Sequence, residues 1–341
     1  MRLIRYDGHE YEAQAGETVL EALLRQGAAA DYSCRRGSCH TCALRCLDGK
    51  VEHTRRIDDS LARDGHILPC VALPQSDLTL ARAELSHRAI EAEVVGRREC
   101  SPGVVELDIA PMRELDFRAG QHVHVVREDG ITRPYSFASL PGEDYFFRIQ
   151  VKRVCDGAMS SWLCDRAGLG TALRLRGPAG DCHYHATMRE RPLLLLATGT
   201  GAGAMLAVAR DALAQGHTAP ITLLHGSRSV ADLYLHDTLL ALSARHPNLR
   251  YIPCVSGEAP PTGGVRGRVT EAAFAHAPDL HDAEVFLCGL PWMVQEARYR
   301  AVLCGAARAR IHTDPFDHAH PPMPRDAEKI ASLKPDPELW A

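Results

Sequence analysis

The stretch Cys34-Arg35-Arg36-Gly37-Ser38-Cys39-His40-Thr41-Cys42 contains three cysteines in the order C-x4-C-x2-C, and Cys70 follows after 27 intervening residues. This is the ligand spacing of a [2Fe–2S] cluster, which is held by four cysteine thiolates. Because three thiolates must converge from one tight loop, the small residues Gly37 and Ser38 suit a backbone that turns its amides toward sulfur. The sequence therefore predicts cluster ligation by Cys34, Cys39, Cys42 and Cys70.

The length and composition indicate a globular protein with more than one domain. The chain has 341 residues, of which 45% are hydrophobic and 24% are charged, and its formal net charge is −4. A chain of this length forms two or three compact cores. No apolar run reaches the length of a membrane span, and residues 1–7 lack the apolar stretch of a secretion signal. We therefore expect a cytoplasmic protein that binds neither membranes nor nucleic acid.

The remaining cysteines and the histidines suggest no second metal site. Eight of the twelve cysteines lie singly along the chain, which fits reduced thiols better than a disulfide framework. Cys46 follows the cluster loop closely and is an alternative ligand, although a lone extra cysteine is more often a small buried hydrophobe. The histidine pairs, such as His183 with His185, lack a carboxylate or cysteine at metal-binding spacing.

Residues 1–85 resemble the plant-type ferredoxin family. Two alternating stretches, Arg2–Tyr6 and His9–Ala13, are joined through Asp7-Gly8, which is a hairpin signal. A helix is expected next, because Val19, Leu20, Leu23 and Leu24 recur at helical spacing between Glu17-Thr18 and Gly27. A hairpin, a helix and then a cysteine loop is the order of a β-grasp ferredoxin.

The pattern changes twice more along the chain. From residue 86 to 184, short β-type runs alternate with Pro and Gly, which indicates a small antiparallel barrel; the runs are Ala92–Val95, Val104–Ile109, His122–Val126, Tyr145–Lys152 and Ala172–Arg176. After residue 192, strands and helices alternate, which predicts a parallel α/β sheet. The strands are Leu193–Ala197, Ile221–His225, Tyr251–Val255 and Glu284–Cys288, and the helices are Ala202–Gln215, Leu233–Arg245, Thr270–Ala277 and Met293–Cys304.

The barrel segment carries motifs that resemble those of the ferredoxin–NADP reductase superfamily. Arg133-Pro134-Tyr135-Ser136, placed at the end of the barrel strands, resembles its R-x-Y-S flavin motif. The resemblance implies that Arg133 meets a flavin phosphate, Tyr135 stacks on the isoalloxazine ring and Ser136 hydrogen-bonds near N5.

Two further segments follow at the spacing of this superfamily. Val151-Lys152 precedes Gly157-Ala158-Met159-Ser160, which resembles the Gly-x-x-Ser segment that opens a helix and receives a flavin phosphate on its amides. Gly177-Pro178-Ala179-Gly180 resembles the G-P-x-G turn that closes the barrel. The resemblance implies that Val151, Lys152, Gly157, Met159 and Ser160 contribute to flavin binding.

The α/β segment carries two nicotinamide motifs. Residues 198–205, Thr-Gly-Thr-Gly-Ala-Gly-Ala-Met, follow an apolar strand, so their amides face a pyrophosphate. They resemble the loop G-G-T-G-x-A-P-M and depart from it at Thr198, Gly203 and Ala204. The implied binding residues are Gly199, Thr200, Gly201 and Gly203. Residues 288–293, Cys-Gly-Leu-Pro-Trp-Met, resemble C-G-P-P-x-M, which implies that Cys288 approaches the hydride-donating carbon beside Gly289 and Met293.

Charge favours NADH over NADPH. In the NADPH-specific relatives a Ser-Arg pair grips the 2′-phosphate, whereas Ser256 is followed here by Gly257 and Glu258, whose charge repels a phosphate. Arg228 is the opposing candidate, since its charge favours a phosphate. We assign Arg228 to the coenzyme site and expect NADH as the preferred donor.

The last motif, Ile311-His312-Thr313-Asp314-Pro315-Phe316, resembles the C-terminal D-P/A-F segment of ferredoxin-fused reductases. The resemblance implies that Phe316 covers the flavin until the nicotinamide displaces it, and simple packing is the alternative. Ser136, Cys288 and Phe316 are thus the expected catalytic residues.

The sequence predicts a multidomain α+β and α/β fold. The expected parts are a β-grasp [2Fe–2S] ferredoxin domain (1–85), an antiparallel flavin-binding β-barrel (86–186), a parallel α/β nicotinamide-binding domain (187–316) and a C-terminal tail (317–341).

The domain order resembles the reductase components of bacterial multicomponent oxygenases and the CDP-6-deoxy-glucoseen reductases. It implies an oxidoreductase that passes electrons from NADH through FAD, preferred over FMN, and the [2Fe–2S] cluster to an acceptor protein. The acceptor is expected to be an oxygenase component or its ferredoxin. A reductase serving a deoxysugar dehydratase is the alternative in the same class, and a zinc-bearing NAD-binding redox sensor is the alternative in another.

Positive charge surrounds the cysteine loop. Residues 34–56 contain six Lys or Arg and two Asp or Glu. An acidic docking face on the acceptor is the functional hypothesis, and a solvated charge run is the alternative. We expect a monomer, because the cluster must be exposed to its partners.

Overall fold

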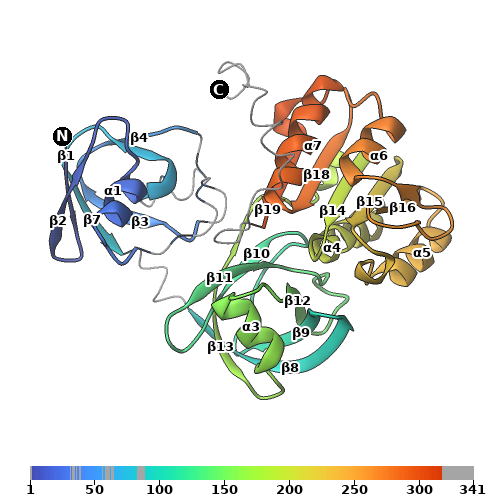
Figure 1. Ribbon diagram of the computed structural model, residues 1–341, viewed down its shortest axis with the longest axis horizontal. Coiled ribbons are helices and arrows are strands. Elements are labelled where there is room, and N and C mark those ends of the chain that lie inside the picture. Colours follow the sequence, from blue (N-terminus) through green and yellow to red (C-terminus); the bar gives the residue numbers. More distant parts are fainter. Residues whose placement is uncertain are drawn as a thin grey trace. The chain divides into compact units, whose positions relative to one another are not determined.

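The computed structural model describes residues 2–30, 32, 35, 37, 40–55, 57, 62, 65–82 and 89–316. The chain folds into two compact units, made mainly of residues 1–89 and of residues 90–131 with 135–317 (Figure 1). Residues 132–134 group with the first unit. The barrel and the α/β sheet share the second unit, so the expected division into three domains and a tail stays a prediction. Within the described ranges, no helix is long and apolar enough to cross a membrane.

The first unit has a mixed five-stranded sheet in the order β2-β1-β7-β3-β5 and a two-stranded sheet of β4 and β6. Its elements are β1 (Arg2–Tyr6), β2 (His9–Ala13), α1 (Val19–Arg25), β3 (Leu44–Asp48), β4 (Val51–His53), β5 (His66–Ile67), the 3-10 turn η1 (Pro69–Val71), β6 (Ala72–Pro74) and β7 (Leu78–Arg82). The predicted hairpin is confirmed: Asp7 and Gly8 both have positive φ, 52° and 76°, as a two-residue type I′ turn requires.

Helix α1 begins where the sequence predicts it. The amide of Glu21 donates to Thr18 Oγ1 at 3.3 Å, and the amide of Thr18 donates to Glu21 Oε2 at 2.9 Å, which is a reciprocal capping box. Val19 and Leu23 are buried in the core of the first sheet.

An antiparallel barrel forms the first part of the second unit. Its strand order is β11-β10-β13-β8-β9-β12, and the antiparallel bridge from Phe137 to Ile149 joins the two edges. The elements are β8 (Ile90–Ser101), β9 (Val104–Pro111), β10 (His122–Val126), β11 (Thr132–Ser136), β12 (Phe147–Lys152), α3 (Ala158–Asp165) and β13 (Ala172–Ala179). Along β12, alternate residues from Phe147 to Val151 face the barrel core, so Gln150 faces the other side.

A parallel six-stranded sheet in the order β17-β16-β15-β14-β18-β19 forms the second part. Its elements are η3 (Ala186–Met188), β14 (Leu193–Thr198), α4 (Gly201–Ala214), β15 (Ile221–Ser227), η4 (Val230–Asp232), α5 (His236–Arg245), β16 (Leu249–Val255), β17 (Val265–Arg266), α6 (Val269–His276), β18 (Glu284–Gly289), α7 (Pro291–Leu303), η5 (Arg308–Arg310) and β19 (Ile311–Pro315).

Alternating side chains of β14 pack in two opposite layers. Leu193 and Leu195 pack with residues of α4 and α5, whereas Leu194 and Leu196 pack with α6 and α7. Helices therefore cover both faces of the sheet (Figure 1), which explains the continuous apolar run of β14.

Residues 133–136 lie in strand β11, which ends at Ser136, and Pro134 is tolerated there because β11 ends the hydrogen-bonded order of the sheet. The structure differs from the sequence expectations in two places. Residues 177–179, predicted as part of a turn, continue strand β13. Residues 311–315 form β19, which pairs in parallel with β18. The predicted tail, 317–341, lies outside the described residues.

Candidate functional site

Two of the four predicted cluster ligands face each other in the first unit. Cys42 and Cys70 are buried, and their Sγ atoms are 3.4 Å apart. Two thiolates that bind one tetrahedral metal at about 2.3 Å lie about 3.8 Å apart, so this pair fits a shared iron. Cys34 and Cys39 lie outside the described residues. Cys46 instead places its Sγ 3.4 Å from the carbonyl of Asp48.

Three described residues of the cysteine loop have the left-handed backbone that tight turns use. Arg35, Gly37 and His40 all have positive φ, between 52° and 75°. A Cβ added at Gly37 would lie 3.0 Å from Val71 Cγ2 and 3.4 Å from Arg55 Cδ. The close packing and the positive φ explain why glycine occupies this position.

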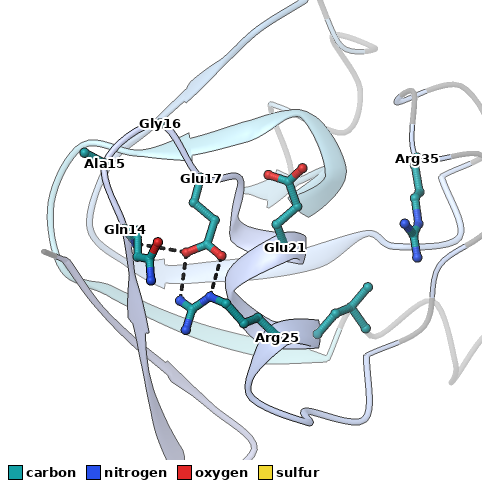
Figure 2. A pocket seen from close by; sticks show the side chains of 8 residues that line it. Gln14, Ala15, Gly16, Glu17, Glu21, Arg25 and Arg35 are labelled. Atoms are coloured by element: carbon teal, nitrogen blue, oxygen red, sulfur yellow. Dashed lines mark hydrogen bonds and ion pairs between the residues drawn. The ribbon is translucent and has the colours of Figure 1, made fainter.

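A shallow hollow borders the same loop in the first unit. It has a volume of about 610 Å³ and is lined by Gln14, Ala15, Gly16, Glu17, Glu21, Leu24, Arg25 and Arg35. Arg25 Nε lies 2.7 Å from Glu17 Oε1, and Figure 2 shows Arg35 lying apart from this pair. The Arg35 guanidinium lies 4.5 Å from the ring centroid of Tyr32. The Glu17 carboxylate is thus engaged locally, and Arg35 makes no ion pair with a carboxylate of the described residues.

Strand β11 carries the predicted flavin motif. Arg133 is exposed, and its Nη1 donates to the carbonyl of Thr132 at 2.8 Å. Pro134 is half-buried, and Tyr135 packs against the barrel core. The Ser136 hydroxyl donates to the carboxylate of Asp314 at 2.5 Å, across 178 positions of sequence.

The start of α3 fits a phosphate. Gly157 is its N-cap and supplies no side chain, which leaves amides of the first turn open to an anion. A Cβ on Gly157 would lie 2.3 Å from Ser160 Oγ, so a side chain there would displace the serine hydroxyl. Ser160 Oγ accepts from the amide of Val154 at 3.2 Å and orders the preceding loop. Val151 and Met159 are buried in the barrel core, so only their backbone can meet a cofactor.

The loop between β14 and α4 fits a pyrophosphate. Gly199 has a φ of 55°, and Thr200 caps α4 without a side-chain hydrogen bond. A Cβ on Gly201 would lie 2.6 Å from the carbonyl oxygen of Cys288. The two predicted nicotinamide motifs are therefore in direct backbone contact. Met293 is fully buried on the opposite face of the sheet, in the α6 and α7 layer.

Thr198 ties the two motifs together. Its Oγ1 accepts from the amide of Leu290 at 2.9 Å. Gly289 has a φ of 124°, and a Cβ there would lie 2.4 Å from Thr198 Oγ1. The backbone oxygen of Thr198 would also lie 2.5 Å from that Cβ, so a side chain at position 289 would clash with Thr198.

Asp314 is the functional candidate that sequence reasoning missed. Its Oδ2 accepts from Ser136 and lies 3.8 Å from Cys288 Sγ. Burial, and to a lesser degree the charge of Asp314, raises the pKa of the Cys288 thiol well above its usual value. Cys288 is therefore a neutral thiol near pH 7. The sequence does contain a signal that could have identified Asp314, because this residue begins the D-P-F segment. The resemblance, however, implies a role only for Phe316 of that segment.

Phe316 lies two residues after Asp314. Its amide donates to the carbonyl of Gly289 at 2.7 Å, and its ring packs half-buried against the core layer that contains Cys288. The contact fits packing as well as a cover over a cofactor.

The loop after β15 is where the coenzyme ribose is expected. Arg228 is exposed, and a Cβ on Gly257 would lie 3.1 Å from its Cγ. The amide of Val230 donates to Glu258 Oε1 at 2.5 Å. The predicted repelling carboxylate and the predicted attracting guanidinium thus belong to one small region.

Three family models match the chain in the order of these sites. They are the 2Fe-2S iron-sulfur cluster binding domain at residues 4–75, the oxidoreductase FAD-binding domain at 96–184 and the oxidoreductase NAD-binding domain at 195–299. The prediction of a [2Fe–2S], FAD and NAD-dependent oxidoreductase is confirmed by these matches.

Two reductases of known systems and one crystal structure match nearly the whole chain. The reductase subunit of an aromatic O-demethylase from Amycolatopsis sp. is 32% identical over 327 residues, which are 92% of this chain and 97% of the relative. The reductase component of the naphthalene 1,2-dioxygenase/salicylate 5-hydroxylase systems of Ralstonia sp. is 30% identical, covering 89% and 94%. The crystal structure of the Amycolatopsis cytochrome P450 reductase GcoB has a TM-score of 0.67 and 28% identity, covering 94% and 100%.

Proposed function

Because the chain belongs to the ferredoxin-fused flavin reductases of the ferredoxin–NADP reductase superfamily, we propose that it is the reductase component of a multicomponent oxygenase. In this role it takes electrons from NADH and delivers them to an oxygenase component or its ferredoxin. The names of the two curated relatives support an oxygenase system over a deoxysugar dehydratase. Bound FAD converts a two-electron hydride into single electrons, and the cluster carries one electron at a time.

The contact of Asp314 with both Ser136 and Cys288 carries the proposal. Ser136 comes from the flavin strand, and Cys288 comes from the predicted nicotinamide strand. A hydride donor and its acceptor must approach closely for transfer. The carboxylate fixes the Ser136 hydroxyl beside the thiol, so the residues of both half-sites meet at one place.

Three other groups of residues hold the cofactors in this proposal. The amides at the start of α3 bind the FAD phosphates. The amides of Gly199, Thr200 and Gly201 bind the NADH pyrophosphate. Cys34, Cys39, Cys42 and Cys70 hold the cluster, where the 3.4 Å separation of the two described thiols supports ligation.

NADH is the proposed donor because of Glu258. Its carboxylate accepts a hydrogen bond from the amide of Val230, which lies in the loop that carries Arg228. A carboxylate fixed there repels the 2′-phosphate of NADPH, and it accepts hydrogen bonds from the hydroxyl groups of an unphosphorylated ribose.

The test is a visible and EPR spectrum of anaerobic holoprotein before and after NADH is added without an acceptor. We expect the flavin and iron–sulfur bands to bleach together and a reduced-cluster EPR signal to appear. Flavin bleaching without that signal would refute the electron path. Bound zinc in place of iron, with no cluster bands before reduction, would favour the redox-sensor alternative.

A further inference from the structure

Helix α4 packs directly against the barrel. A Cβ on Gly203, two residues after the nucleotide loop, would lie 1.9 Å from Gln150 Oε1 and 3.1 Å from the Cβ of Ala138. One turn further on, Ala207 is buried with Ala119 and Leu140 of the barrel. The helix that begins at the coenzyme loop therefore rests on the barrel, and a side chain at position 203 would have to displace the Gln150 amide.

Gln150 fills the space that the glycine leaves. The residue is 8% exposed, its Oε1 accepts from the Tyr234 hydroxyl at 2.6 Å, and its Nε2 donates to Glu106 Oε2 at 2.8 Å. Glu106 is 6% exposed and pairs with Arg98 at 2.8 Å. A chain of polar groups, buried at Glu106 and Gln150, therefore runs from Arg98 on the barrel surface to Tyr234, which precedes α5.

The position of Gln150 links both halves of the candidate site. Its neighbour Ile149 forms the bridge to Phe137, which follows Ser136. On its other side Gln150 contacts Gly203, in the helix that begins at Gly201. Gly201 in turn packs on the carbonyl of Cys288. A shift of Gln150 would thus change the separation between the Ser136 strand and the coenzyme loop.

We propose that Gln150, held by Tyr234, is a positioning residue that sets the alignment of the flavin-binding barrel and the nicotinamide-binding loop for hydride transfer. This inference rests on the proposed function. Gly203 stands where the similar family motif has alanine, and an alanine methyl there would require the Gln150 amide to move. Lys152 reinforces the contact only weakly, since its 3.8 Å ion pair with Asp232 is exposed.

The test uses Gln150→Met, which keeps the volume and removes the amide, and Tyr234→Phe, which removes one hydroxyl. In anaerobic stopped-flow reduction by NADH, both variants should lower the limiting rate of flavin reduction at least about tenfold. The NADH dissociation constant should change less than about threefold. The charge-transfer absorbance between reduced flavin and NAD⁺ should weaken in parallel. A double variant no slower than Gln150→Met alone would show that the two residues act as one unit.

Tyr251→Phe is the matched control, because it removes a buried tyrosine hydroxyl that contacts His236 within the α/β sheet. A second readout uses flavin-free protein: in Gln150→Met, amide hydrogen exchange should speed up in both 147–152 and 201–206, and in Tyr251→Phe in neither segment.

Normal reduction rates in both variants, or a loss confined to NADH affinity, would overturn the positioning role. Faster exchange in 147–152 alone would do the same. Failure of NADH to reduce the flavin of the unmodified protein would instead refute the proposed function, so the two failures are distinguishable.

Discussion

The Ser136 hydroxyl donates a 2.5 Å hydrogen bond to Asp314, which also lies 3.8 Å from the Cys288 thiol. We expect Asp314→Ala to lower the limiting rate of flavin reduction by about ten- to a hundredfold, because the Ser136 hydroxyl loses its fixed orientation. The limiting rate should fall less in Asp314→Asn, because the amide oxygen can still accept the hydrogen bond from Ser136. Stopped-flow reduction by NADH measures both, and a change in Asp314→Ala below twofold would exclude a role for the carboxylate.

Cluster content should depend on Cys70 and not on Cys46. Cys70 Sγ faces Cys42 Sγ at 3.4 Å, whereas Cys46 Sγ lies against the backbone of its own strand. We expect Cys70→Ser to lose most of its iron and acid-labile sulfide, and Cys46→Ser to keep both. Chemical iron and sulfide determination decides the point. Normal cluster content in Cys70→Ser would show that another residue is the fourth ligand.

Coenzyme preference should shift when the charge of Glu258 is removed. One exposed charge contributes about 1 kcal/mol, so Glu258→Gln should raise kcat/KM for NADPH about fivefold. The value for NADH should stay within about twofold, because the amide oxygen still accepts from the Val230 amide. Steady-state kinetics with ferricyanide as acceptor and both coenzymes provides the comparison. Equal effects on NADH and NADPH would place the 2′ site elsewhere.

Acceptor docking should be sensitive to the charge of Arg35. The side chain lies at the cysteine loop, beside the hollow in Figure 2. With an acidic plant-type ferredoxin as acceptor, Arg35→Glu should slow electron transfer about tenfold at low salt and much less at about 0.5 M salt. Arg245→Glu, an equal charge change on α5, is the control. A salt-independent rate in the unmodified protein would contradict electrostatic docking.

Acid stability should depend on His225. Burial lowers its pKa from 6.5 to about 4, although a contact with the Gly199 backbone partly offsets the effect. Between these values the unfolded chain binds the proton and the folded protein does not, so the free energy of unfolding falls as pH falls from 6.5 to 4. The loss amounts to about 3 kcal/mol.

Urea unfolding of the flavin-free protein at several pH values between about 4 and 7 tests the His225 prediction. In His225→Leu the fall in the free energy of unfolding between pH 6.5 and 4 should be smaller by about 3 kcal/mol. His276→Leu, at an exposed position, should leave this pH dependence unchanged. Identical slopes for His225→Leu and the unmodified protein would contradict the assignment.

Local sequence determined the elements of this protein and the order of its sites. Asp7-Gly8 specifies a hairpin because only residues that tolerate positive φ form its turn, and Thr18 with Glu21 specifies a helix start through a capping box. The apolar run of β14 indicates a strand covered on both faces. These signals act over a few residues, so they can be recognised without the fold.

Tertiary structure alone decided which distant residues meet. Residues 311–315 carry no strand pattern of their own and form β19 by pairing with β18, which brings Asp314 to Ser136. In the sequence, Gly203 is only a small residue where the similar family motif has alanine. The fold places the Gln150 amide where a side chain at position 203 would lie. The reason is physical: pairing and packing between segments far apart in sequence depend on the shape of both partners, and neither segment encodes the other's position.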